Sequence, residues 1–368
     1  MSQENHTPNY WDYLRLRPLL SIQGGLENDE HQLAADELHF IITHQALELW
    51  FKLMLVELRL ARDHLDSPQL DEQQVPHVVH HLKRVSEILR LATRTFGVME
   101  TLTPQDFLSF RDKLTPASGF QSFQMREIEL LLGIDWGKRV KYGKVDPLDH
   151  IRKLSKNSDA GALAVERIEV ALNETSLRSA LHGWLYRTPI NGSQPGDEND
   201  EDVVETFLSD YAAAIASQHH EQSERLIATS LEKRKEVTEK FEKLTEAARF
   251  YLQAEDVEKD QKRIKRIRAA LIFIESYRDL PLLAWPRLLI DAIVEVESQM
   301  VMFRHRHARA VERIIGRRVG TGGSSGVNYL DKTTSIRVFH DLWMVRTMLL
   351  PKSGRPPVKN GAFYQFRS

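Results

Sequence analysis

The segment that decides the fold is FIITHQALELWFKLMLVEL, residues 40–58. Its apolar side chains recur three and four positions apart, which is the spacing of one face of a helix. The same spacing returns at residues 78–89 and 269–277. Alternating apolar and polar runs bounded by hairpin turns, the pattern of paired strands, are missing from the sequence. The chain is therefore predicted to be all-α, with long helices.

The small number of turn-forming residues, and the positions of some of them, support this prediction. The 368 residues include only 18 glycines and 14 prolines, so long elements are expected. Thr103-Pro104 and Thr115-Pro116 each resemble an N-cap followed by proline at the first helical position. Gly133 follows a run of leucines and suits a C-terminal cap.

The helical pattern is interrupted once, at TPINGSQPGDENDED, residues 188–202. This stretch is polar, acidic and rich in turn formers, so it predicts a surface loop. The following residues 217–254 are highly charged at helical spacing, which is typical of a solvated helical arm or hairpin. Length alone favours about two domains. We nevertheless expect a single domain over residues 1–368, with residues 188–257 as a surface loop and charged helical insertion.

Composition excludes several classes of function. The charges nearly cancel, 50 Lys+Arg against 52 Asp+Glu, which argues against a general nucleic-acid or membrane-surface binder. The absence of cysteine excludes disulfides, cysteine-ligated zinc, iron–sulfur clusters, thiolate-ligated haem and a cysteine nucleophile. The first residues, MSQENHTPNYWDYL, lack the features of a secretory signal, and no apolar run is long enough to span a membrane. A cytoplasmic protein is expected.

The histidines are the candidate nitrogen ligands for a metal. His305 and His307 lie two positions apart, so on a helix their side chains point about 200° apart. Phe303 and Val311 share the helical face of His307, whereas Arg309 shares that of His305. His307 is therefore predicted to be the buried imidazole. A buried imidazole is more often a hydrogen-bonded core residue than a metal ligand, so the spacing alone favours the core residue, with ligation as the alternative.

His44 raises the same question. Its helical face carries Phe40, Ile41, Leu47 and Phe51, so the imidazole is expected among apolar side chains. The pattern favours a hydrogen-bonded core histidine, with a functional imidazole as the alternative.

Two further segments carry candidate binding groups. Residues 320–326, GTGGSSG, form either a flexible linker or a loop that closes over a substrate; the lysine of a phosphate-binding loop is absent. Arg126 lies in the opening turns of a predicted helix. It either pairs with Glu129 at the surface or holds a substrate carboxylate through its two-pronged guanidinium.

Four segments together closely resemble the tryptophan 2,3-dioxygenase family. They are YWDYL at residues 10–14, FIITHQALELWFK at 40–52, PASGFQSFQMREIE at 116–129 and HARAVERIIGRRVGTGGSSGVNYL at 307–330. The resemblance extends over about residues 10–350 and is weakest at about 140–257. It implies an all-α, haem-binding helical bundle that carries haem b and assembles as a homotetramer, a dimer of dimers. The implied reaction is cleavage of the indole C2–C3 bond of L-tryptophan by O₂ to give N-formyl-L-kynurenine, the first step of the kynurenine pathway.

The resemblance also implies roles for individual residues. His307 matches the axial ligand of the haem iron, and His44 matches the histidine that hydrogen-bonds the indole N–H. Arg126 matches the arginine that binds the substrate carboxylate, and Thr321 a loop threonine that contacts the ammonium and carboxylate groups. Phe40 matches an aromatic wall of the indole pocket. Whether His44 acts as a base is left open.

The N-terminal residues are expected to act in another subunit. By the same resemblance, Tyr10 and Tyr13 match tyrosines that reach a neighbouring subunit's substrate site, so residues 1–35 are expected to form an intersubunit arm.

The sequence departs from the family pattern at three places. Leu47 stands where animal members usually have tyrosine, Phe303 replaces a common tryptophan, and Phe123-Gln124-Met125 replaces a more usual hydrophobic-Gln-Phe. These positions leave the specificity for the indole ring open. The alternatives are a haem-dependent aromatic monooxygenase of secondary metabolism acting on a modified tryptophan or tyrosine, a non-catalytic haem or gas sensor, and a structural helical oligomer.

Overall fold

The computed structural model describes residues 9–68, 72–135, 147–155, 158–229, 233–322 and 326–366. Among these residues there are helices and one isolated bridge between Ile190 and Ser193, but no strand. The all-α prediction is confirmed. None of the described helices carries an apolar stretch long enough to cross a membrane.

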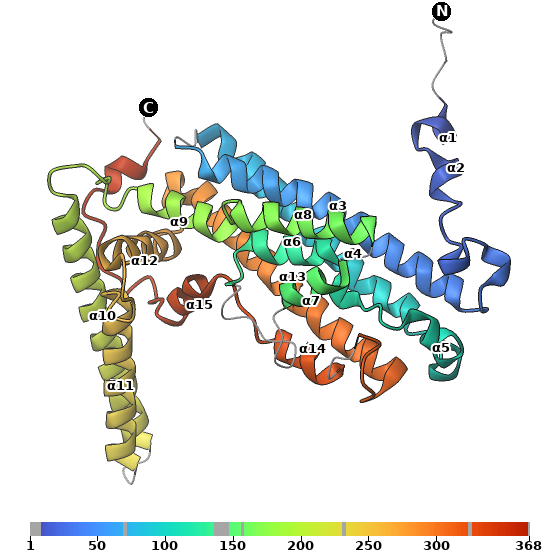
Figure 1. Ribbon diagram of the computed structural model, residues 1–368. Coiled ribbons are helices and arrows are strands. Elements are labelled where there is room, and N and C mark those ends of the chain that lie inside the picture. Colours follow the sequence, from blue (N-terminus) through green and yellow to red (C-terminus); the bar gives the residue numbers. More distant parts are fainter. Residues whose placement is uncertain are drawn as a thin grey trace, which may run out of the picture.

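Three long helices form the centre of the molecule: α3 (Glu37–Asp66), α4 (Val75–Met99) and α13 (Ala284–Ile315). Helix α4 lies between the other two and packs along both (Figure 1). It can do so because its buried side chains recur at helical spacing and form one broad apolar face. Val78, Leu82 and Leu89 are among those that solvent does not reach.

Shorter helices cover this centre. Helices α6 (Phe123–Leu132) and α9 (Leu177–Arg187) pack on α3, and α8 (Asp159–Asn173) packs on α6. Helix α12 (Gln261–Ser276) lies against α9, and α14 (Val327–Thr333) lies against α13. The remaining short helices are α5 (Pro104–Phe110), α7 (Pro147–Leu154) and α15 (His340–Thr347).

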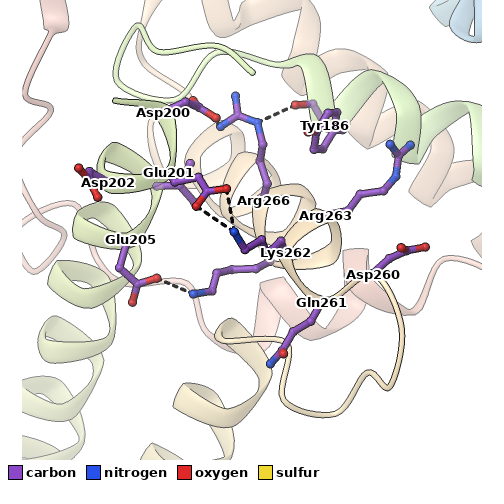
Figure 2. A pocket seen from close by; sticks show the side chains of 12 residues that line it. Tyr186, Asp200, Glu201, Asp202, Glu205, Asp260, Gln261, Lys262, Arg263 and Arg266 are labelled. Carbon is purple, nitrogen blue, oxygen red and sulfur yellow. Dashed lines mark hydrogen bonds and ion pairs between the residues drawn. The ribbon is translucent and has the colours of Figure 1, made fainter. Parts of the chain in front are cut away.

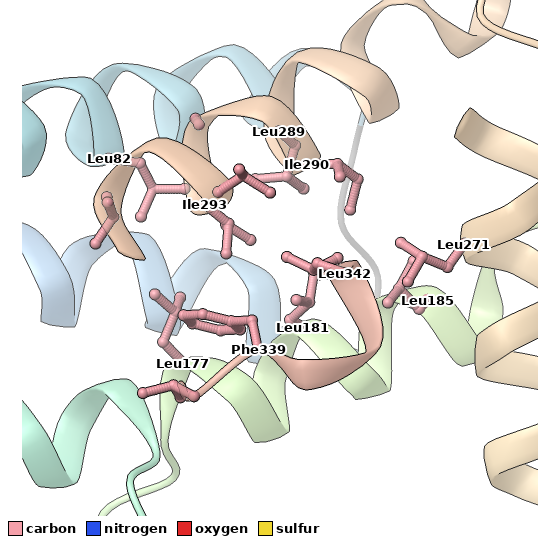
Figure 3. Close-up of a cluster of buried hydrophobic side chains, with 14 of the residues drawn as sticks. Leu82, Leu177, Leu181, Leu185, Leu271, Leu289, Ile290, Ile293, Phe339 and Leu342 are labelled. Atoms are coloured by element: carbon pink, nitrogen blue, oxygen red, sulfur yellow. The ribbon is translucent and has the colours of Figure 1, made fainter. Parts of the chain in front are cut away.

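Branched aliphatic side chains fill the main core (Figure 3). Leu82 from α4, Ile293 from α13 and Leu181 from α9 meet there, and all three are buried. Truncating a side chain such as Ile293 to alanine would cost about 2–5 kcal/mol of folding stability. The core thus fixes α4 and α13 relative to each other.

Two of the predicted helix boundaries are confirmed. Helix α5 begins at Pro104, and the side chain of Thr103 accepts a hydrogen bond from the backbone N–H of Asp106 at 3.2 Å. Helix α6 ends at Leu132 and is capped by Gly133, whose φ of 105° lies in the left-handed region that suits glycine.

The helix start predicted at Thr115-Pro116 is wrong. Thr115 instead follows a short 3₁₀ turn, and its peptide bond to Pro116 is cis. The next α-helix begins at Phe123, where the side chain of Ser122 accepts from the backbone N–H of Met125. A capping pair needs helical residues directly after it, and here another short turn intervenes before α6.

The charged segment forms a helical hairpin. Helices α10 (Asp200–Thr229) and α11 (Arg234–Leu252) pack against each other and extend away from the body (Figure 1). Helix α10 begins at Asp200, slightly before the predicted end of the loop. Its first turn contains three acidic residues, which favour a helix N-terminus because of the helix dipole.

The N-terminal residues form an arm. Helices α1 (Tyr10–Tyr13) and α2 (Leu16–Leu19) stand clear of the helical body (Figure 1). The arm is joined to α3 next to His44, because the amide of Gln23 donates to Gln45 Oε1 at 2.8 Å.

Candidate active site

The candidate site is a hollow between several segments of the chain. Helices α3, α4, α6, α13 and α14 and the turn at Gly119 line about 830 Å³ of space, part of which is open to solvent. Three residues singled out from the sequence, His44, Arg126 and His307, line it together. The other lining residues are Leu47, Glu48, Phe51, Phe96, Gly119, Ser122, Met125, Glu129, Phe303, Arg304, Tyr329, Leu330 and Thr333.

His307 and His305 differ as predicted. His307 is partly buried and lines the hollow, whereas His305 is exposed to solvent. The imidazole of His307 stacks on Phe96, with ring centroids 5.3 Å apart and planes 8° apart. No described residue forms a hydrogen bond with a ring nitrogen of His307. A histidine with a purely structural role in the core would normally have such a partner.

The environment keeps His307 neutral. Burial lowers its pKa from 6.5 to about 4, and the nearby His44 and Arg126 act in the same direction. A neutral imidazole is the form that coordinates a metal. His307 together with its aromatic neighbours Phe51, Phe96 and Phe303 would therefore suit a large, flat, mostly apolar group such as haem, whose iron the imidazole would hold.

His44 has one defined tautomer. Its Nδ1 lies 2.8 Å from the carbonyl oxygen of Phe40, and because a carbonyl only accepts, Nδ1 carries the proton. The surrounding protein displaces water from the ring and lowers its pKa below 6.5, although the Phe40 carbonyl and Glu48 oppose that shift. The ring nevertheless remains accessible from the hollow. Neutral His44 thus presents Nε2 as a hydrogen-bond acceptor.

Arg126 is buried in the wall of the hollow. Its side chain is 7% exposed, and its Nη1 lies 3.0 Å from Glu129 Oε2. The predicted pair with Glu129 therefore exists, but it is not at the surface. A buried guanidinium beside a cavity is suited to bind an anionic group, since its N–H donors have a fixed planar arrangement.

The other predicted residues lie outside this lining. The ring of Phe40 lies behind His44, with centroids 4.1 Å apart, and also packs against Phe107 and Phe110. Thr321 Oγ1 donates to the carbonyl of Ala117 at 2.6 Å, which ties the glycine-rich loop to the turn before α6.

The glycine-rich loop is only partly described, because residues 323–325 lie outside the described part of the chain. Gly326 has a φ of 58°, and a Cβ there would lie 2.7 Å from the carbonyl oxygen of Arg318. Glycine is therefore required at this end of the loop.

Tyr10 and Tyr13 do not line the hollow. They are 69% and 81% exposed on α1, far from the site. Trp11 between them is 63% exposed, so three large rings lie on one short solvent-facing segment.

Sequence reasoning missed several lining residues. Glu129 was considered only as a surface partner, and Arg304 was not considered. Both had a signal: Glu129 lies three positions after Arg126, and Arg304 three positions before His307, so each shares a helix face with a predicted site residue. Tyr329 of α14 had no such signal.

A second, larger hollow does not carry this chemistry. It encloses about 1370 Å³ between the end of α9 and the starts of α10 and α12. Ion pairs cross it, Lys262 to Glu201 at 3.0 Å and Arg266 to Asp200 at 2.8 Å (Figure 2). No histidine lines it, and its paired charges join the base of the helical hairpin to α12.

Comparison with known proteins identifies the family. The family model described as tryptophan 2,3-dioxygenase matches residues 2–349. The chain is 44% identical over 373 residues to "Tryptophan 2,3-dioxygenase 2" of Ralstonia nicotianae, covering 97% of both chains. It is 42% identical over 372 residues to "Tryptophan 2,3-dioxygenase" of Sorangium cellulosum, covering 98% of this chain and 87% of the relative. The chain belongs to the tryptophan 2,3-dioxygenase family.

Proposed function

We propose that this protein binds haem b and uses it to cleave the indole C2–C3 bond of L-tryptophan with O₂. The product is N-formyl-L-kynurenine, which contains both oxygen atoms, so no reductant is consumed in each turnover. The family is haem-dependent and its relatives are named for this activity. The observation that carries the proposal is the meeting of His44, Arg126 and His307 on one hollow.

His307 would hold the haem iron. Its neutral imidazole faces the hollow, and Phe96 stacked on it limits how the ring can rotate. When bound, haem supplies the oxidation chemistry through which O₂ reacts with the substrate. The protein then contributes binding, orientation and the exclusion of water.

Two side chains would orient the substrate. Arg126 would bind its carboxylate, and Nε2 of His44 would accept a hydrogen bond from the indole N–H, because the bond from Nδ1 to Phe40 fixes that tautomer. Two anchors at opposite ends of L-tryptophan restrict both its position and its rotation. Holding reacting groups in this way accounts for a large share of many enzymes' rate enhancement.

The loop and the arm would complete the site. Thr321 would contact the substrate's ammonium and carboxylate groups after moving from its present bond to Ala117. Tyr10 and Tyr13 would contact the site of a neighbouring subunit in a homotetramer. The exposure of these rings supports that role, because large aromatic side chains on a terminus are normally buried against something.

The decisive experiment uses haem-loaded, reduced protein mixed with L-tryptophan and ¹⁸O₂. N-formyl-L-kynurenine carrying two labelled atoms, formed without further reductant, is the expected product. A product with one labelled atom that requires reductant would indicate a monooxygenase. A haem spectrum without any product would indicate a sensor. Either of these two outcomes would refute the proposal.

A further inference from the structure

The carboxylate of Glu129 lies between two buried guanidinium groups. Its Oε2 is 3.0 Å from Nη1 of Arg126, and its Oε1 is 3.7 Å from Nη2 of Arg304. All three side chains are buried, at 3% exposed for Glu129, 7% for Arg126 and 6% for Arg304. All three also line the hollow.

This cluster joins two helices that carry different functions. Glu129 and Arg126 are on α6, whereas Arg304 is on α13, one turn before His307. Arg304 is further held by a hydrogen bond from its Nη1 to the carbonyl of Ile336 at 3.4 Å. The substrate-binding side of the hollow is thus linked to the haem-ligand helix through one carboxylate.

Electrostatics makes that carboxylate necessary. Two guanidinium groups that face the same buried space repel each other, and Glu129 is the acid that contacts both. The pKa of Arg304 reflects this balance: burial and Arg126 lower it, whereas Glu129 and Glu297 raise it. Without the charge of Glu129, we expect Arg126 to move away from Arg304.

The geometry is also compatible with substrate binding at Arg126. Glu129 contacts Nη1, which is not part of the Nε–Nη2 edge of the guanidinium. That edge is one of those through which arginine forms two parallel N–H bonds to a carboxylate. One carboxylate can therefore position the guanidinium while another binds to it.

We propose that Glu129 is a positioning residue, which holds Arg126 between α6 and Arg304 in the orientation that binds the substrate carboxylate. The inference rests on the proposed function, since it assumes that Arg126 binds that group. Its consequence is that Glu129 affects affinity only for substrates that have a carboxylate.

Glu127 provides a matched control. It is on the same helix and is 1% exposed, but it does not line the hollow. It also contacts two arginines, Arg167 Nε at 2.7 Å and Arg59 Nη2 at 3.1 Å. Glu127→Gln therefore removes a buried carboxylate between two arginines on α6 without touching the candidate site.

The test compares equilibrium binding of L-tryptophan and of tryptamine, which lacks the carboxylate, to haem-loaded wild type, Glu129→Gln and Glu127→Gln. We expect Glu129→Gln to weaken L-tryptophan binding about ten- to hundredfold, the range for losing one hydrogen bond to a charged group. The affinity of Glu129→Gln for tryptamine should stay within about twofold of wild type. The affinities of Glu127→Gln for L-tryptophan and for tryptamine should also stay within about twofold. Glu129→Asp, which keeps the charge on a shorter side chain, should restore part of the affinity.

The outcomes separate the two proposals. If Glu129→Gln loses affinity equally for L-tryptophan and tryptamine, the role of Glu129 is merely structural and the inference is overturned. Tighter binding of L-tryptophan by Glu129→Gln would also overturn it. If Glu129→Gln does not fold, Glu129→Asp is judged by the same selective weakening. Failure of wild type to form product would instead overturn the proposed function, whereas binding is measured without turnover.

Discussion

Replacing His44 with serine separates an orienting histidine from an obligatory base. The structure assigns Nε2 of the neutral ring as an acceptor, so the change removes one neutral hydrogen bond to the indole N–H. Such a bond contributes about 0.5–1.5 kcal/mol, which corresponds to about a two- to twelvefold fall in kcat/KM. Loss of a general base would instead cost roughly 10²–10⁴-fold. We expect the smaller effect.

The assay is kcat/KM for L-tryptophan at pH 7, with the haem spectrum as a check that the cofactor is retained. A fall of more than about a hundredfold in haem-loaded His44→Ser would refute the orienting role, because it reaches the range of general-base loss.

The pH dependence provides a second check on His44. The pKa of its imidazole lies below 6.5, mainly because of desolvation, so the accepting form persists as the pH falls from 8 to 6.5. Below 6.5 the ring gains a proton as the pH passes through the lowered pKa, and Nε2 then becomes a donor. Wild-type kcat/KM should be flat above pH 6.5 and decrease below it. His44→Ser should lack the His44-dependent part of that decrease; identical profiles would contradict the assignment.

Three further predictions follow from the same geometry. His307→Ala should lose tight haem binding while His305→Ala keeps it, as measured by Soret absorbance per protein; loss with His305→Ala alone would mean that the ligand is misassigned. Arg126→Met should raise KM for L-tryptophan roughly 30- to 5000-fold, which corresponds to a loss of about 2–5 kcal/mol of binding free energy, with an unchanged haem spectrum. A change in KM within about twofold would mean that another residue binds the carboxylate. Deleting residues 1–16 should weaken both assembly, measured by light scattering, and L-tryptophan affinity, with haem incorporation spared; a fully assembled variant with unchanged kcat/KM would show that the arm packs only on its own subunit.

The helices were predictable because their signals are periodic. Apolar spacing over residues 40–58 predicted a helix that forms the middle of α3, and the same reasoning separated His307 from His305. Capping signals were less reliable because they involve only a few residues. Thr103-Pro104 and Thr115-Pro116 look alike in sequence, yet only the first begins a helix. The difference lies in what the following residues pack against, which a local pattern does not contain.

The candidate site was predictable within each helix but not between helices. The three-residue spacing from Arg126 to Glu129 places both on one face, as does that from Arg304 to His307. That these two faces meet depends on α6 packing on α3, α3 on α4, and α4 on α13. Periodicity specifies which side of each helix is buried, but it does not specify which helices are neighbours. The family resemblance supplied this link for His44, Arg126 and His307.

The position of the hollow explains why charged side chains are buried there. Helices α6 and α13 are held apart because each packs on a different member of the α3–α4 pair, so short apolar side chains do not close the space between them. Long side chains reach across it, as Glu129 and Arg304 do. Burying their charges costs free energy, which opposite charges and hydrogen bonds nearby offset. In this hollow Glu129 supplies such an opposite charge, because its carboxylate contacts both Arg126 and Arg304.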